Sequence, residues 1–272
     1  MVGALALCSL PYAAVADAHS KPLFEVGLAG GGGYLPDYPA SDESHFRALA
    51  LPFVAYRGEF LRSDEKGLLR GRILSTERLE LDVSLTGSFP ADADDNEARR
   101  GMPDLDWLGE IGPRLQITIA RAGRDAKLEI ELPVRAVFST DLSALDYRGL
   151  VVAPQISYQH DDFLRSGLKL KLSGGPSFAT RERMDLFYEV EARFATPARA
   201  AFAARPGHLG TALQLTTLYA IDERTRSFLV MRADSHHGAA NQNSPLFGAD
   251  LTASIGIGVI CSFYQSERRV RE

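Results

Sequence analysis

The chain has very little cysteine and no long apolar run, and each absence excludes a class of protein. Its 272 residues include two cysteines, Cys8 and Cys261, and no CxxC pair, which excludes a disulfide framework and a cysteine metal site. A helical membrane protein would need uncharged apolar runs of about 18 residues or more, and the mean hydropathy of -0.10 argues against them. The net charge of -5 gives no reason to expect nucleic acid as a partner.

Apolar and polar residues alternate over much of the chain, which is the pattern of β-strands and not of helices. In residues 251–264 the odd positions are apolar and most even positions are small or polar. The same alternation recurs in residues 78–86, 128–135 and 168–172. A strand needs about 9–11 residues to cross a bilayer, and residues 251–264 are long enough. We therefore predict an all-β fold, an antiparallel transmembrane β-barrel of the outer-membrane type with about 12 strands.

Twelve segments of the sequence are predicted to be strands. They lie near residues 23–34, 47–57, 67–74, 78–88, 109–120, 127–138, 148–160, 167–178, 186–194, 208–220, 226–236 and 250–264. An even number is typical of bacterial outer-membrane barrels. Aromatic residues lie near many of the strand ends, where an interfacial girdle would hold them. A soluble sandwich fits the same periodicity, but strand length and these aromatics favour the membrane barrel.

Three parts can be distinguished along the chain. Residues 1–18 resemble a secretory signal peptide, with an apolar core and the small-residue pattern Ala14-Val15-Ala16. The usual basic region before the core is missing, which indicates a start inside a longer precursor. Residues 19–264 form the predicted single barrel domain, and residues 265–272 form a charged C-terminal tail that we expect to be disordered.

The predicted connections between strands are uneven in length. Residues 35–46, 89–108 and 237–248 are long and polar, and the segment between Pro197 and Pro206 favours a short helix. Outer-membrane barrels have short periplasmic turns and long external loops. With both termini in the periplasm, the twelve predicted strands put loop 35–46 outside but loop 89–108 inside, which conflicts with this rule.

No local motif points to catalysis or metal binding. The chain has neither a G-x-S-x-G nucleophile motif nor an HExxH metal motif. His236 and His237 would point to opposite faces of a strand, so we interpret them as a solvated strand end and not as a metal pair. A Ser–His–acid triad assembled from distant residues stays open as an alternative.

Charged residues on the polar face of the predicted strands are expected in the lumen. They are Arg78, Glu80, Asp82, Glu129, Glu131, Arg135, Lys169 and Lys171. Their signs are mixed, so two arrangements are open: ion pairs that fill the interior, or a narrow polar pore. Filling by ion pairs is favoured, because the interior of such a barrel is not much wider than side chains can occupy.

The N-terminal part of the chain contains a recognisable family signature. Residues 31–42, Gly-Gly-Gly-Tyr-Leu-Pro-Asp-Tyr-Pro-Ala-Ser-Asp, and residues 52–58 resemble the first motifs of the MipA/OmpV family. Residues 100–106, 110–113 and 244–246 resemble later ones. The positions that carry the resemblance are Gly33, Pro36, Asp37, Tyr38, Pro39, Ser41, Tyr56, Arg57, Gly58, Gly101, Met102, Pro103, Asp104, Gly112, Pro113, Ser244 and Pro245.

The resemblance implies a Gram-negative outer-membrane barrel without catalytic residues or cofactors. One family member is a scaffold that brings a lytic transglycosylase together with a penicillin-binding murein synthase, and others are described as porin-like or adhesive. We therefore expect a non-enzymatic scaffold for murein enzymes. The alternatives are a small porin-like channel for polar solutes and an adhesin or barrel hydrolase. For the motif residues the resemblance implies structural roles only. Pro36 and Pro39 would rigidify the first loop, and Asp37 and Ser41 would hydrogen-bond its turns.

Overall fold

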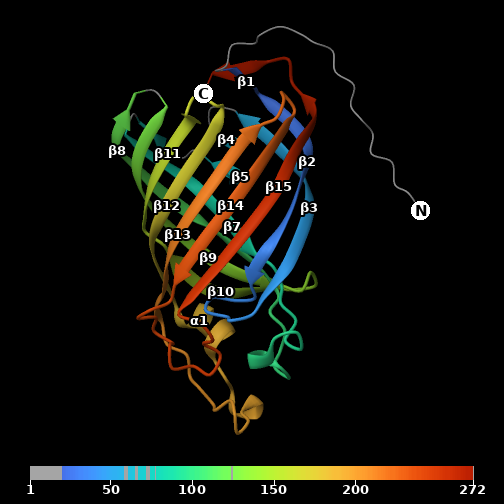
Figure 1. Ribbon diagram of the computed structural model, residues 1–272, viewed down its shortest axis with the longest axis vertical. Coiled ribbons are helices and arrows are strands. Elements are labelled where there is room, and N and C mark those ends of the chain that lie inside the picture. Colours follow the sequence, from blue (N-terminus) through green and yellow to red (C-terminus); the bar gives the residue numbers. More distant parts are fainter. Residues whose placement is uncertain are drawn as a thin grey trace, which may run out of the picture.

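The strands form a tall barrel, with the first described strand β1 (Ser20–Pro22) and its partner β16 (Arg269–Arg271) at one end and long loops at the other (Figure 1). The structure, a computed structural model, describes residues 20–57, 61–64, 67–71, 74–76, 78–123 and 125–271. The predicted signal peptide, residues 1–18, lies outside the described residues. None of the described helices has the length and apolarity needed to cross a bilayer.

The wall of the barrel is an antiparallel sheet in which neighbours in sequence are mostly neighbours in space. Its strands are β2 (Phe24–Pro36), β3 (Ser44–Arg57), β4 (Leu61–Asp64), β5 (Gly67–Gly71), β6 (Leu74–Ser75), β7 (Leu79–Ser88), β8 (Trp107–Ala122), β9 (Ala126–Thr140), β10 (Leu145–Val152), β11 (Gln155–Phe163), β12 (Leu168–Ala179), β13 (Gly207–Ala220), β14 (Thr225–Ser235) and β15 (Leu251–Gln265). The C-terminal strand β15 pairs with β2, from Ile255 opposite Tyr34 to Gln265 opposite Glu25. First and last strands of the wall are thereby joined.

Twelve positions make up the described wall when two interrupted strands are each counted once. The strands β10 and β11 both lie between β9 and β12 and are separated by Ala153 and Pro154. The short β5 and β6 likewise follow each other between β4 and β7. The predicted barrel of about 12 strands is therefore confirmed, although its members differ in two places.

The prediction of a strand at residues 186–194 is wrong. This segment holds the end of helix α1 (Arg181–Tyr188) and a 3-10 turn, Ala192–Phe194. Its apolar residues Phe187, Tyr188 and Val190 are buried against loops and do not face lipid. The helix predicted between Pro197 and Pro206 is also wrong, since that stretch has no helical residues. A strand that was not predicted, the four-residue β4, restores the even number.

The added strand removes the conflict over loop 89–108. With β4 in place, the connections 37–43, 89–106, 180–206 and 236–250 all lie at one end of the barrel, which we call the loop end. The connections at the opposite end are short, such as 164–167 and 221–224, and the pair β1 and β16 lies there (Figure 1). We call this the terminal end.

The wall turns its apolar side chains outward and its polar side chains inward. In β15, Ile257 is 65% exposed, whereas Thr252 and Ser262 are buried on the other face. Aromatic side chains near strand ends are exposed and paired across strands, as for Tyr34 with Phe46. A soluble sandwich would bury the apolar face, so this distribution excludes it and is typical of a membrane barrel.

Gly112 in β8 offers a direct test of the wall packing. A Cβ atom at this position would lie 2.0 Å from the carbonyl oxygen of Val134, whereas a Cβ at Gly109 would meet nothing within 4 Å. We expect Gly112→Ala to push β8 away from β9 and to lower the free energy of unfolding by about 1–3 kcal/mol. The measurement is denaturant unfolding in detergent micelles, with Gly109→Ala as the matched control. Equal stability of the two variants would contradict this account of the wall.

Candidate functional site

A hydrophobic cluster, which we call the cap, lies at the loop end of the barrel. The cap is built from the four long connections 37–43, 89–106, 180–206 and 236–250 together with the wall residues beneath them. Its buried members are Tyr38, Ala40, Ala91, Leu105, Leu108, Val137, Val151, Ala179, Met184, Phe187, Tyr188, Ala204 and Leu209. Because these residues come from loops and from wall strands on several sides, the cap is a conventional hydrophobic core set into the mouth of the barrel.

Two tyrosine hydroxyls connect the loops of the cap. The hydroxyl of Tyr38 donates to the carbonyl oxygen of Leu246 at 2.8 Å, and that of Tyr188 donates to the carbonyl oxygen of Pro39 at 2.9 Å. The Ser244 hydroxyl donates to the Tyr188 carbonyl at 2.7 Å. Burial raises the pKa of Tyr38 to about 12 and raises that of Tyr188 as well. Both hydroxyls therefore stay protonated and keep donating at any physiological pH.

Asp37 joins the first loop to the wall and to the loop after β7. Its carboxylate accepts from Arg47 at 3.0 Å and from the Asn96 side-chain amide at 2.9 Å, and it lies 2.8 Å from Nδ1 of His45. Asn96 also donates to the Ser41 hydroxyl at 3.2 Å. The family signature residues Asp37 and Ser41 are thus structural contacts within the cap.

The other signature residues lie mostly around the cap. Asp104 accepts from the Ala93 amide at 2.8 Å, Pro103 accepts from Arg99 at 3.0 Å, and Gly101 has a φ of 78° that favours glycine. Pro36 ends β2, Pro39 and Pro245 lie in loops, and Met102 donates its amide to the Arg99 carbonyl. The wall positions are Gly33, Tyr56, Arg57, Gly112 and Pro113, while Gly58 lies outside the described residues.

His236 differs from the interpretation of a solvated strand end. It is 2% exposed and contacts three elements: the Leu209 carbonyl and the Thr252 hydroxyl, each at 3.1 Å, and the Ala40 amide, which donates to it at 3.1 Å. Only its neighbour His237 is exposed. The histidine is a structural link between the first loop and the wall, and its sequence position alone carries no sign of this role.

We expect Asp185 in helix α1 to make the stability of the helix depend on pH. Burial and the neighbouring Glu189 carboxyl raise the pKa of Asp185 from 3.8 to about 6. A carboxyl group whose folded pKa is raised stabilises the fold below its unfolded pKa, and this contribution is lost as the pH rises through the folded value. We expect Asp185→Asn to slow hydrogen exchange in residues 181–189 at neutral pH and to leave it unchanged near pH 4. Equal effects at both pH values would contradict this account.

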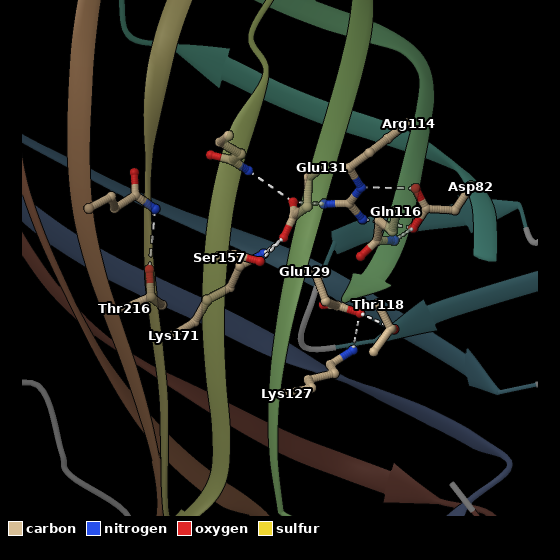
Figure 2. A network of polar contacts seen from close by, with 12 residues as sticks. Asp82, Arg114, Gln116, Thr118, Lys127, Glu129, Glu131, Ser157, Lys171 and Thr216 are labelled. Carbon is tan, nitrogen blue, oxygen red and sulfur yellow. Dashed lines mark hydrogen bonds and ion pairs between the residues drawn. The ribbon is translucent and has the colours of Figure 1, made fainter. Parts of the chain in front are cut away.

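An ion-pair network lies in the lumen below the cap, centred on Glu131 (Figure 2). The Glu131 carboxylate is fully buried and accepts from Lys171 at 2.5 Å, from the Ser157 hydroxyl at 2.6 Å and from the Gln155 amide at 2.9 Å. Arg114 lies 3.6 Å from its second oxygen. Four strands, β8, β9, β11 and β12, are tied together through this one carboxylate.

Further ion pairs of the lumen lie close to those of Glu131. Arg114 donates to both oxygens of Asp82 at 2.9 and 2.7 Å, while Lys127 pairs with Glu129 at 2.8 Å (Figure 2). Nearer the cap, Glu110 accepts from Arg135 and from Arg183, each at 2.9 Å. Charge-assisted pairs of this kind are the stronger hydrogen bonds of proteins.

A cavity of about 660 Å³ runs along the lumen beside these ion pairs. Its lining reaches from Tyr38 and Phe187 of the cap to Lys127 and Asp161 near the terminal end. The lumen is therefore neither fully packed nor free of ion pairs.

The eight charges expected in the lumen fall into three groups. Asp82, Glu129, Glu131, Arg135 and Lys171 form the ion pairs described above. Glu80 and Lys169 line the cavity. Arg78 is exposed and lies just before β7. The partners Glu110, Arg114 and Arg183 were not singled out from the sequence, because only the strand register and the path of α1 bring them to the others.

The described histidines form no catalytic constellation. Their side-chain hydrogen bonds are with Asp37, with threonine hydroxyls and with backbone groups, and no hydrogen bond from a histidine to a serine is present among the described residues. The described part of the chain also contains no group of three or more His, Cys, Asp or Glu that could hold a metal ion.

The chain has distant structural likenesses among known barrels. No curated protein matches the sequence. The NanC porin has a TM-score of 0.41 and 8% identity, with 86% of this chain and 98% of that chain covered. Outer membrane phospholipase A from Escherichia coli has a TM-score of 0.37 and 10% identity, with coverage of 88% and 90%. The outer membrane channel DcaP of Acinetobacter baumannii has a TM-score of 0.36 and 10% identity, with coverage of 91% and 99%.

One family profile spans nearly the whole chain. The profile described as "MltA-interacting protein MipA" matches residues 28–263, from the first wall strand to the last. With the outward apolar face of the wall, this match confirms the predicted outer-membrane location and barrel fold. The chain is an outer-membrane β-barrel that belongs to the MipA, or MltA-interacting protein, family.

Proposed function

We propose that this protein is a capped, non-conducting barrel that serves as a membrane scaffold for murein-processing enzymes. The observation that supports the first part is the cap, a hydrophobic cluster of loop and wall residues at the loop end of the barrel. A porin keeps a water-filled channel, and a core of Met184, Phe187 and Tyr188 in the mouth would obstruct one. The scaffold role is supported by the family description, which names an interaction with MltA.

The terminal end supplies a defined surface for such a partner. The tail after β15, expected to be disordered, pairs instead as β16 (Arg269–Arg271) with β1 (Ser20–Pro22). The Leu23 amide donates to the Arg268 carbonyl at 2.8 Å, which holds the tail against the start of β2. Short turns and chain termini of outer-membrane barrels face the periplasm, the compartment that contains murein. We infer that the partner binds this tail and the adjacent turns.

Affinity capture from membranes tests the scaffold proposal. The charge-reversal variant R268E/R269E changes the tail, and R193E changes an exposed arginine of the cap as the matched control. We expect the unaltered protein and R193E to retain a murein enzyme, and R268E/R269E to lose most of it. Surface charge changes of this kind act mainly on partner association. If no murein enzyme is retained under conditions that preserve folded barrels, the scaffold proposal fails.

A second candidate is a channel for polar solutes, and the lumen cavity favours it. The cavity of about 660 Å³ is large enough for a small solute, so movement of the cap would leave a polar path. Electrical conductance separates the two functions, because a capped scaffold passes no steady current and a channel does.

A further inference from the structure

The ion pairs of the lumen expose their two partners unequally. The Lys171 side chain is 32% exposed against 0% for Glu131, Lys127 is 24% against 6% for Glu129, and Arg114 is 12% against 0% for Asp82. These three acidic partners do not line the cavity, whereas Lys171, Lys127 and Arg114 do. Each ion pair is neutral as a whole, but its cation is more exposed to the lumen than its carboxylate. A solute in the lumen therefore meets more positive than negative charge at these pairs.

The end of the cavity below the cap carries an excess of positive charge. One carboxylate, Glu110, serves both Arg135 and Arg183 at 2.9 Å. Arg183 is 4% exposed, and its Nε and Nη1 have no hydrogen-bond partner among the described residues. Arg232 lines the same cavity and is paired with Asp234 at 2.6 Å. With the pair of Arg47 and Asp37, which also lines this end, four guanidinium groups face three carboxylates.

We propose that the lumen is a binding cavity for an anionic solute, whose carboxylate or phosphate group is held by Arg135 and Arg232 below the cap. Arg232 donates from Nε and Nη2 to Asp234, and Arg135 donates from Nε to Glu110. A guanidinium has five N–H donors, so those beyond these bonds can donate to either kind of oxyanion. The buried charge of Arg183 adds to the attraction without touching the solute, and the lysines Lys127, Lys169 and Lys171 line the path from the terminal end.

The geometry of the cavity sets the size of this solute and the side from which it enters. A volume of about 660 Å³ falls within the range of sites for small organic ligands. Because the cap lies at the loop end, we expect the solute to enter from the terminal end, where Lys127, Asp161 and Lys169 line the cavity. A sugar or glycopeptide fragment of the periplasm that carries a carboxylate fits these conditions, as does a small phosphate ester.

Calorimetric titration of the folded protein in a zwitterionic detergent tests the proposal. Four probes are used at low ionic strength: N-acetylmuramyl dipeptide, digalacturonate, inorganic phosphate and the uncharged sugar chitobiose. We expect at least one of the anions to bind, and salt to weaken the binding. Binding of the muramyl dipeptide alone assigns the solute to murein, binding of both carboxylates assigns a general acidic sugar site, and binding of phosphate alone assigns a phosphate ester.

Matched arginine variants locate the binding group. We expect R135Q and R232Q to weaken anion binding about tenfold or more, and R193Q, on an exposed arginine of the cap that does not line the cavity, to leave it unchanged. A gel that separates folded from heat-unfolded barrel shows whether each variant has folded. If R135Q does not fold, R232Q alone tests the binding site. The proposal is overturned if no anion binds, if chitobiose binds as well as the anions, or if R232Q equals R193Q. The enzyme-capture result is independent of all these outcomes.

Discussion

Removing the centre of the cap should convert a silent barrel into a conducting channel. Ala179 at the end of β12 lies directly opposite Gly207 at the start of β13, so an Asn-Gly turn can replace residues 180–206 without disturbing the wall. The deletion removes Met184, Phe187 and Tyr188 from the mouth of the barrel. We expect steady single-channel steps in planar bilayers where the intact protein gives none, and a preference for anions because the lumen presents its cations.

Two controls make the deletion experiment decisive. The gel that separates folded from heat-unfolded barrel shows whether the deletion variant has folded, and R193Q, which alters only an exposed cap residue, should stay silent. A folded deletion variant that passes no current would place the obstruction elsewhere in the lumen and would contradict the role assigned to the cap.

Loss of the Glu131 carboxylate should strongly destabilise the barrel. In Glu131→Gln, Lys171 and Arg114 lose a fully buried negative charge (Figure 2). Removing one partner of a buried ion pair typically costs about 3–5 kcal/mol. Because the Lys171 side chain is 32% exposed, water can compensate in part, and we expect a loss of about 3 kcal/mol in the free energy of unfolding.

Denaturant unfolding in detergent micelles measures this loss. The control is Glu191→Gln, which breaks an exposed pair with Arg193 and should change stability by less than about 1 kcal/mol. In a double-mutant cycle, Glu131→Gln combined with Lys171→Met should cost less than the sum of the single changes, because the two side chains contact each other. Additive losses would show that the contact contributes nothing.

The barrel wall is predictable because its pattern is local. Alternation in residues such as 251–264 reports two faces of a strand directly, and the structure has a strand over Leu251–Gln265. The pattern in residues 186–194 predicts a strand wrongly, because its apolar residues belong to the cap. They are buried by contacts with residues that are distant in the sequence. The strand β4 is four residues long, too short for a periodic signal.

The cap and the pairing of the lumen charges depend on contacts that the sequence does not display. His236 and Ala40 are 196 residues apart in the sequence, and other hydrogen-bonded partners in the cap are separated by a similar number of residues. Strand alternation predicts that Glu131 and Lys171 share a polar face, but only the register of β9, β11 and β12 brings them to 2.5 Å. Arg183 enters the lumen on a helix that the alternation could not indicate.

Single-channel recording of the intact, folded protein tests the central claim most directly. The barrel is refolded, checked on the gel that separates folded from heat-unfolded protein, and inserted into planar bilayers. A barrel closed by the cap should insert and stay electrically silent. Steady, reproducible conductance steps from the folded protein would contradict the capped, non-conducting barrel and would make the channel its function.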